Sequence, residues 1–191
     1  ILLVTLLLSV LIVWREGRDV DRRALAVPMM GQFIGIGAAL IVLGWIAPWT
    51  LSILTGSIVL VAVALSGLGL RVQPTPPSLV LAGTLAGFMG TTASIPGPPL
   101  ALLHQHVPAS HMRGTLAHFF VVGNALSLVG LAWTGRLSVD DIGAGLILFP
   151  AALMGYAGSS LVANQLPASL IRGLVLVFSA SGALMLIYKA S

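Results

Sequence analysis

Helix-breaking residues stand next to one another in the middle of a long apolar segment. Residues 96–99 read Pro-Gly-Pro-Pro and interrupt the segment 78–103. Each proline lacks a backbone N–H, and its ring clashes with the carbonyl four residues earlier, so the segment cannot form one continuous helix. Backbone that leaves a helix at membrane depth is tolerated only where protein buries it or where it lines a polar cavity. The break therefore points to a binding site inside a membrane, although a proline kink without a ligand is the simpler alternative.

Composition supports the membrane setting. The chain of 191 residues is 58% hydrophobic and only 7% charged, whereas a soluble domain carries about 25% charged residues. The net charge of +4 does not indicate nucleic-acid binding, because the cations lie at the ends of apolar segments, where they orient membrane proteins. The absence of cysteine excludes disulfides, thiolate catalysis and cysteine-ligated metals.

Apolar segments of membrane-spanning length follow one another along the chain, separated by short polar or proline-bearing links. Residues 1–13 are too short to span and read as the second part of a helix whose beginning is absent. The sequence predicts an all-α polytopic membrane protein with about six to seven transmembrane segments and a broken or re-entrant helix at residues 94–99. The predicted spans are 24–47, 50–70, 78–103, 114–134, 142–164 and 168–188.

A weak internal repeat relates residues 24–70 to residues 142–188, with a proline and a small-residue cluster at matching places. It predicts that residues 1–77 are the remainder of a first repeat, whose broken helix is absent. Residues 78–191 then form the second repeat, and both belong to one membrane domain. If the broken segment crosses the membrane the repeats are parallel, and if it forms a hairpin they are inverted. The charge bias of the loops is equal in both cases and leaves the choice open.

Small residues predict close helix packing at two places in the chain. Gly31 and Gly35, and likewise Gly83 and Gly87, are separated by three residues. This spacing places both glycines of a pair on one face of a helix and lets another helix approach closely. The predicted role is tight packing.

The break predicts anion chemistry. Proline is favoured at the first helical position, so a new helix is expected to start at Gly97 and to place its positive N-terminus inside the membrane. The hydroxyls of Thr91, Thr92 and Ser94 would add donors. All five acidic residues are expected in loops, and an intramembrane carboxylate is what a proton or cation pathway usually employs. An anion is therefore favoured over a cation.

Three residues after the break have two interpretations each. Arg113 either attracts or holds an anion or anchors the helix at the membrane edge. Asn124 either contacts a ligand or forms an interhelical hydrogen bond. His118 is a candidate proton relay, or an interfacial histidine bonded to a carbonyl. The four histidines have no cysteine or acid near them, so no metal site and no cofactor is expected.

The order of several motifs resembles the second half of the sulfite exporter family TauE/SafE, also called TSUP. The motifs are Gly87-Phe-Met-Gly90, Ile95-Pro-Gly-Pro-Pro-Leu100, Arg113-Gly-Thr-Leu116, Phe119-Phe120, Asn124 and Trp133-Thr-Gly-Arg-Leu137. The charged loop 15–23 resembles the end of that family's first half. The equivalent glycine- and proline-rich motif of the first half is not in this chain.

The resemblance implies a multi-pass protein of the bacterial inner membrane, built from two related halves. It implies that the protein is not an enzyme. The implied function is a secondary transporter that exports small anions such as sulfite, organosulfonates or related sulfur-containing anions by alternating access. A passive anion channel and a non-transporting membrane scaffold are the alternatives. The expected partners are a small anionic substrate and the lipid bilayer, with a homo-oligomer left open and no nucleic acid. The predicted substrate-binding residues are Thr91, Thr92, Ser94, Pro96, Gly97, Pro98, Pro99, Arg113 and Asn124.

Overall fold

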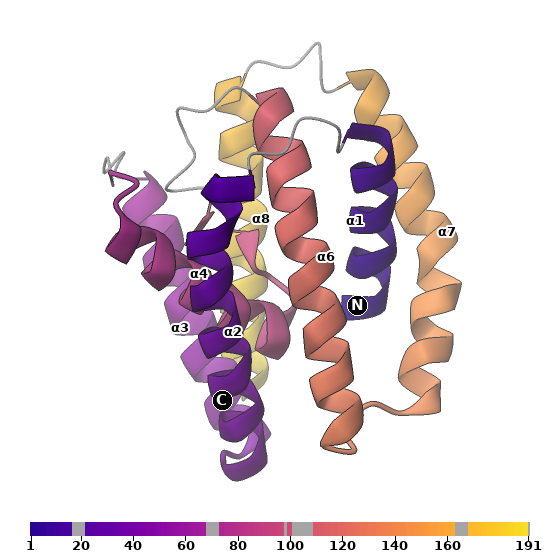
Figure 1. Cartoon of the computed structure of the whole chain (residues 1–191). Helices are drawn as coiled ribbons and strands as arrows, with labels where there is room; N and C mark the ends of the chain where they lie inside the picture. The colour runs from indigo at the N-terminus through magenta and orange to yellow at the C-terminus, as the bar shows by residue number, and fades with distance from the viewer. Residues whose placement is uncertain (17–21, 68–72, 98, 101–108, 163–167, 191) are drawn as a thin grey trace.

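The computed structural model describes residues 1–16, 22–67, 73–97, 99–100, 109–162 and 168–190, and it contains no strand in these ranges. The helices stand side by side as a bundle (Figure 1). This architecture confirms the predicted all-α class. The seven helices are α1 (Leu2–Glu16), α2 (Arg22–Trp45), α3 (Pro48–Gly67), α4 (Pro76–Ala93), α6 (Ala109–Trp133), α7 (Val139–Val162) and α8 (Ala168–Ala190).

Local sequence signals set several helix starts. α3 and α4 each begin with a proline, whose missing N–H has no partner at the first helical position in any case. Before α4, the Thr75 N–H donates to Ser78 Oγ at 2.9 Å and the Ser78 N–H donates to Thr75 Oγ1 at 3.4 Å. This reciprocal capping box satisfies two donors that the first turn leaves without a helical partner.

The acids were not all placed correctly by the sequence. Asp140 and Asp141, expected in a loop, lie in the first turn of α7. Asp141 accepts the Ser138 N–H at 3.0 Å, while the Asp141 N–H donates to Ser138 Oγ at 3.1 Å. Negative charge is favoured at a helix N-terminus, which explains why the helix begins earlier than predicted. Both acids remain at the end of the helix.

The described helices give fewer complete spans than the six to seven expected. Three are long and apolar enough to cross a membrane, within Leu25–Trp45, Gly114–Trp133 and Val139–Gly158. Three shorter apolar stretches are Leu2–Arg15, Ser52–Val61 and Leu176–Met185. The predicted span 78–103 yields only the 18 residues of α4, because the break ends that helix.

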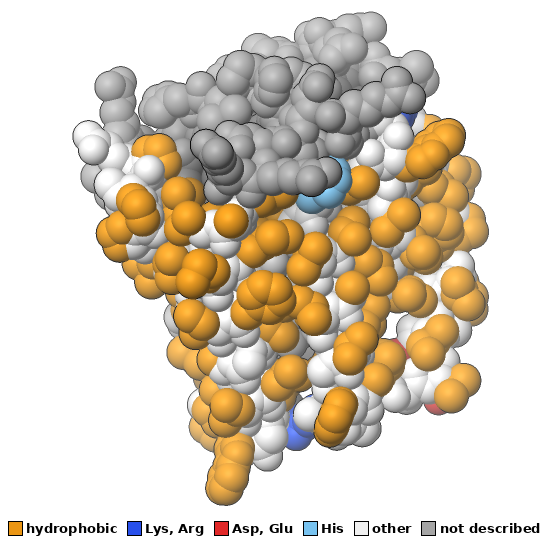
Figure 2. All heavy atoms as spheres, viewed as in Figure 1, with side chains coloured by type: hydrophobic (Ala, Val, Ile, Leu, Met, Phe, Trp, Pro, Cys, Tyr) orange, Lys and Arg blue, Asp and Glu red, His pale blue; other side chains and the backbone are white. Residues whose placement is uncertain are grey.

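The outer surface is that of a membrane protein. Hydrophobic side chains are spread over the whole described part of the face drawn in Figure 2, and charged side chains are few on it. The four tryptophans, Trp14, Trp45, Trp49 and Trp133, are all exposed and lie near helix ends. Aromatic rings are enriched at both membrane–water interfaces, so their positions mark the boundaries of the apolar layer.

The predicted glycine pairs meet each other. Gly31 and Gly35 of α2 face Gly83 and Gly87 of α4, and a Cβ atom added to any of the four would overlap a backbone carbonyl oxygen of the other helix. Only glycine permits this approach, which confirms the predicted packing role. α2 and α4 therefore form one tightly joined unit.

α4 lies at the centre of the contacts. Its Ala82 and Ala86 pack in one buried cluster with Leu25 of α2 and Phe119 of α6. Further along, Met89 packs with Val59 of α3 and Ala183 of α8. The helix that carries the break is thus held by α2, α3, α6 and α8.

The helices before and after the break, α4 and α6, point the same way, as their contacts with α2 show. Gly31 lies against Val80 and Gly35 against Thr84, so residue numbers rise together along α2 and α4. α6 follows α2 in the same sense, because Gln32 lies against Gly123 and a Cβ on Gly130 would meet the side chain of Leu40. α4 and α6 are therefore parallel, and the chain between them must return to the end at which α4 began.

The described part of that return is visible in the core. After the break, Leu100 is buried in the cluster that contains Ala82, Ala86 and Phe119. Both α4 members of this cluster, Ala82 and Ala86, lie about two turns or more before the end of α4 at Ala93, so the chain has turned back along that helix. The break is a re-entrant hairpin, which decides the alternative that the loop charges left open.

The hairpin bears on the expected arrangement of repeats. Residue numbers fall along α1 as they rise along α6, because Ser9 and Asn124 line one cavity while Leu2 and Leu131 line another. α1 and α6 are therefore antiparallel. In the predicted repeat, α1 is the remaining part of the counterpart of α6. Inverted repeats require such counterparts to run in opposite directions. The equivalence of the two halves stays a prediction.

Candidate anion-binding site

The hairpin turns sharply at the end of α4. Ser94 adopts the left-handed conformation, with φ 59° and ψ 28°, and its N–H donates to the Gly90 carbonyl at 2.9 Å. The Ile95 N–H donates to the Met89 carbonyl at 3.4 Å. These bonds satisfy carbonyls that the end of a helix leaves without partners. Ser94 is the one described non-glycine residue with positive φ, and such backbone strain concentrates at functional sites.

Glycine at position 90 lets the chain fold back. A Cβ atom there would lie 3.2 Å from Cβ of Pro96, so the proline ring packs directly on the α4 backbone. Beyond Pro96, the chain is helical again at Gly97, Pro99 and Leu100. The predicted helix start at Gly97 is confirmed for these described residues.

Hydroxyl groups join α4 to its neighbours beside the turn. Thr91 Oγ1 lies 2.8 Å from Ser127 Oγ of α6, and the Thr55 hydroxyl of α3 donates to Thr92 Oγ1 at 3.2 Å. Thr91 and Thr92 also each donate their own proton to the carbonyl one turn earlier, at 2.8 Å. Both threonines therefore hold the hairpin in place. Their predicted role as donors to an anion would require them to exchange these bonds.

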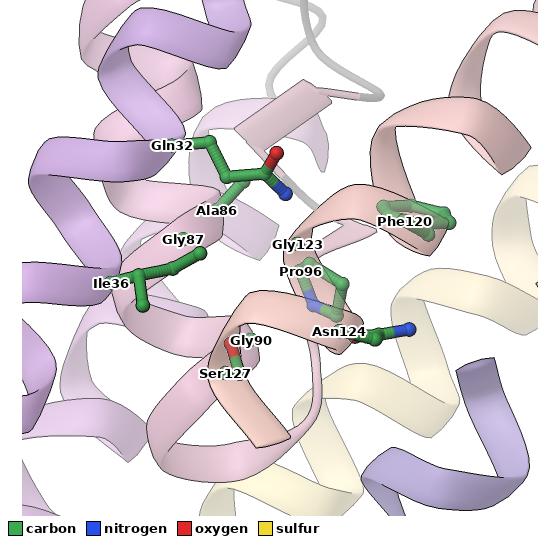
Figure 3. Close-up of a pocket in the computed structure, with 10 residues that line it drawn as sticks. All are labelled: Gln32, Ile36, Ala86, Gly87, Gly90, Pro96, Phe120, Gly123, Asn124 and Ser127. Carbon is green, nitrogen blue, oxygen red and sulfur yellow. The ribbon is translucent and has the colours of Figure 1, made fainter. Parts of the chain in front are cut away.

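Two buried amide side chains, those of Gln32 and Asn124, line the same small cavity but differ in their hydrogen bonds. Gln32 Nε2 donates to the Phe119 carbonyl at 3.1 Å, and it reaches this atom because Gly123 has no side chain in the way. Asn124 is 3% exposed, and its Nδ2 has no hydrogen-bond partner within the described structure. An unpaired buried donor costs about 1–3 kcal/mol, so it needs an explanation. Figure 3 shows the Asn124 amide nitrogen directed away from Gln32 and Ser127.

Two cavities adjoin at Asn124. The smaller has a volume of about 10 Å³ and is drawn in Figure 3, where Gln32, Asn124 and Ser127 contribute its polar side chains. The larger has a volume of about 200 Å³. Because one water needs roughly 10–15 Å³, the smaller holds at most a single water and the larger has room for a small anion. The larger cavity is lined by Thr5, Leu8, Ser9, Pro96, Gly97, Phe120 and Asn124.

The buried polar side chains of the described residues gather at the hairpin. Each of them lines one of the two cavities or bonds to an α4 threonine next to the turn. Polar groups inside a membrane protein are expensive and usually mark function. These residues are Ser9, Gln32, Thr55, Thr91, Asn124 and Ser127. Sequence reasoning missed Ser9, Gln32, Thr55 and Ser127, although each is an isolated polar residue within an apolar segment.

The predicted proline and glycine residues fall in different places. Pro96 and Gly97 line the larger cavity, and a Cβ atom on Gly97 would meet nothing within 4 Å. Pro99 is buried and helical. Pro98 lies outside the described residues.

Ser94 faces a third cavity. Its volume is about 290 Å³, and Leu128 and Arg136 also line it. Ser94 is therefore not brought together with Asn124, which lines the other two cavities. Its predicted contact with an anion at the hairpin stays a prediction.

The two predicted charged groups near α6 are only partly described. The Arg113 backbone lies in the first turns of α6, while its side chain is outside the described structure. His118 Nδ1 lies 2.9 Å from the Gly114 carbonyl oxygen. This is the contact of the interfacial interpretation, and its role as a proton relay stays a prediction.

Fold and site together define a class. A helical membrane protein with a re-entrant hairpin, whose buried polar groups gather at the turn, has the construction of a transporter. The model of the family described as sulfite exporter TauE/SafE matches residues 1–186. The chain therefore belongs to the TauE/SafE family of membrane transporters, which confirms the resemblance found in its motifs. No curated protein and no solved structure was found to match it.

Proposed function

We propose that this protein is a secondary transporter that exports small sulfur-containing anions, sulfite or organosulfonates, by alternating access around the hairpin. Its family supports anion export in general. The observation that carries the proposal is the Asn124 amide, a buried donor without a partner beside a cavity of about 200 Å³. An anion supplies the acceptor that this donor lacks. We place the protein in the bacterial inner membrane as a multi-pass protein.

The few polar groups at the larger cavity, in a lining that is otherwise apolar, favour an anion. The side chains that line the larger cavity contribute hydroxyl and amide groups and include no carboxylate. Asp140 and Asp141 lie in the first turn of α7. Asp141 lines the third cavity with Ser94 and Arg136, but neither acid lines the larger cavity at Asn124. A desolvated cation would need a carboxylate or several carbonyl oxygens, whereas N–H and O–H donors suit an oxyanion.

The packing also suggests which parts move. α2 and α4 touch through their backbones at four glycines and should move as one unit. α6 joins that unit through side-chain bonds, among them Gln32 to Phe119 and Thr91 to Ser127. Side-chain bonds can exchange partners at small cost, so the gap between the α2–α4 unit and α6 is where alternate access would open.

Counterflow tests the proposal. Purified protein in liposomes should exchange radiolabelled sulfite or methanesulfonate for unlabelled anion across the membrane, with saturation, and should move neither sodium nor potassium. Asn124→Leu should reduce the exchange at least tenfold. Ser181→Leu is the matched control, because Ser181 is an exposed α8 residue whose hydroxyl bonds only to the Val177 carbonyl of its own helix.

Three results would contradict the proposal. Flux that rises linearly with concentration, without counterflow and with unitary currents, would establish a channel. No flux of any sulfur anion from well-folded protein would establish a scaffold. Normal counterflow in Asn124→Leu would show that the anion does not bind at the hairpin.

A further inference from the structure

α1 presents a polar face to the larger cavity. Between Leu2 and Val13 its only polar residues are Thr5 and Ser9, and a separation of four places both on one side of a helix. Both line the cavity, and Ser9 is only 5% exposed. The Thr5 hydroxyl donates within α1, to the Leu2 carbonyl at 3.0 Å. The helix is otherwise apolar, so this face is directed at the cavity rather than at lipid.

α6 supplies the opposite wall with the same spacing. Phe120 and Asn124 lie four residues apart and both line the cavity. Asn124 contributes the unpaired Nδ2 donor, and Phe120 contributes an aromatic ring. The cavity thus has donors on two facing helices, Ser9 on α1 and Asn124 on α6.

The rest of the wall is apolar. Leu8, Pro96 and Phe120 line it, and no charged side chain is among its lining residues. At Gly97 the cavity is widened by a missing side chain: a Cβ atom there would meet nothing within 4 Å. The φ of Gly97 is not positive, so neither backbone strain nor close packing requires glycine at this position.

We infer that the cavity selects amphipathic anions by the length of their carbon substituent, with Gly97 setting the limit. The oxyanion head lies between Ser9 and Asn124, and the substituent packs against Leu8 and Phe120 beside Gly97. This inference rests on the proposed function and adds Ser9, Leu8 and Phe120 to the site. Burial of one methylene raises affinity about fourfold, so affinity should climb with each carbon until the space is filled.

A homologous series measures this selection. Sulfite and methane-, ethane- and propanesulfonate compete with labelled methanesulfonate in liposome counterflow, and each inhibition constant is determined. The unmodified protein should bind the sulfonates about fourfold more tightly per added methylene. Gly97→Ala should weaken every anion, with a loss that grows with chain length and flattens the series. Ser9→Ala should weaken all of them by a similar factor and keep the slope.

The control is Gly37→Ala, which adds the same methyl group to an exposed glycine of α2 where a Cβ would also meet nothing within 4 Å. It should leave the series unchanged. Equal affinity for all chain lengths in the unmodified protein, or an unaltered slope in Gly97→Ala, would overturn the inference. The proposed function would still stand if sulfite flux depends on Asn124. No flux of any of these anions would overturn both.

Discussion

Replacing each of the two buried amides with leucine should change stability in opposite directions. Asn124 and Gln32 are both 3% exposed, and both line the smaller cavity at the hairpin. Gln32 Nε2 donates to the Phe119 carbonyl at 3.1 Å, whereas Asn124 Nδ2 has no partner in the described structure. The same chemical change therefore removes a satisfied donor at one position and an unsatisfied donor at the other.

The magnitudes follow from that difference. A buried donor without a partner costs about 1–3 kcal/mol, so Asn124→Leu should stabilise the ligand-free protein by roughly that amount. Loss of a made hydrogen bond costs about 0.5–1.5 kcal/mol, so Gln32→Leu should destabilise it. The two variants should differ by about 1.5–4.5 kcal/mol, which is large against the usual net stability of a protein.

Reversible unfolding in detergent measures both effects, with and without a saturating sulfonate. Ligand at one hundred times its Kd should add about 2.7 kcal/mol to the unmodified protein. Asn124→Leu should lose that increment while it gains stability in the absence of ligand.

The reasoning is refuted if Asn124→Leu destabilises the ligand-free protein as Gln32→Leu does. That result would mean that the Asn124 amide already has a partner when no anion is bound. An undiminished stabilisation by sulfonate in Asn124→Leu would separately show that this amide does not hold the anion.

Two further pairs of substitutions test the α2–α4 unit and the hairpin, both by chemical unfolding in detergent. Gly35→Ala should destabilise by about 1–3 kcal/mol, because its methyl group would overlap the Thr84 carbonyl oxygen, while Gly37→Ala should not; equal effects would contradict the close packing. Position 94 has the left-handed conformation with φ 59°, which glycine adopts without strain and a β-branched residue does not. Ser94→Gly should therefore stabilise the protein by about 1 kcal/mol and Ser94→Val should destabilise it. A valine variant as stable as the unmodified protein would contradict the strain.

The helices and the close packing at their glycine pairs were predictable from the sequence. Lengths of apolar sequence bounded by charged or proline-bearing links gave most helix ends within a few residues. The exception is the end of α4, which the break places ten residues before the predicted end. Gly31 with Gly35 and Gly83 with Gly87 predicted close helix packing, because small residues on one face of a helix let another backbone approach; that the two pairs meet each other is a finding of the structure. These features depend on local sequence, which is why reading along the chain finds them.

The re-entrant path and most of the polar site were not predictable. Hairpin and crossing gave the same balance of loop charges. The decision depends on the parallel course of α4 and α6 and on the burial of Leu100 in the cluster that contains Ala82 and Ala86. Gln32 was missed because its partner, Phe119, is 87 positions away, and a single amide in an apolar segment has no periodic pattern. Asn124 was found only with two open interpretations, since its unpaired state is a property of the folded core.

Thiol labelling at the cavity tests most directly whether the hairpin is an anion site. The chain contains no cysteine, so Gly97→Cys introduces a single thiol at a position where the structure leaves open space. In proteoliposomes a small water-soluble thiol reagent should modify this cysteine, and methanesulfonate should slow the reaction with a midpoint near its transport affinity in the same variant. Gly37→Cys, on the exposed side of α2, should show no protection. A Gly97→Cys thiol that never reacts, or that reacts equally fast with and without the sulfonate, would contradict an anion site at the hairpin.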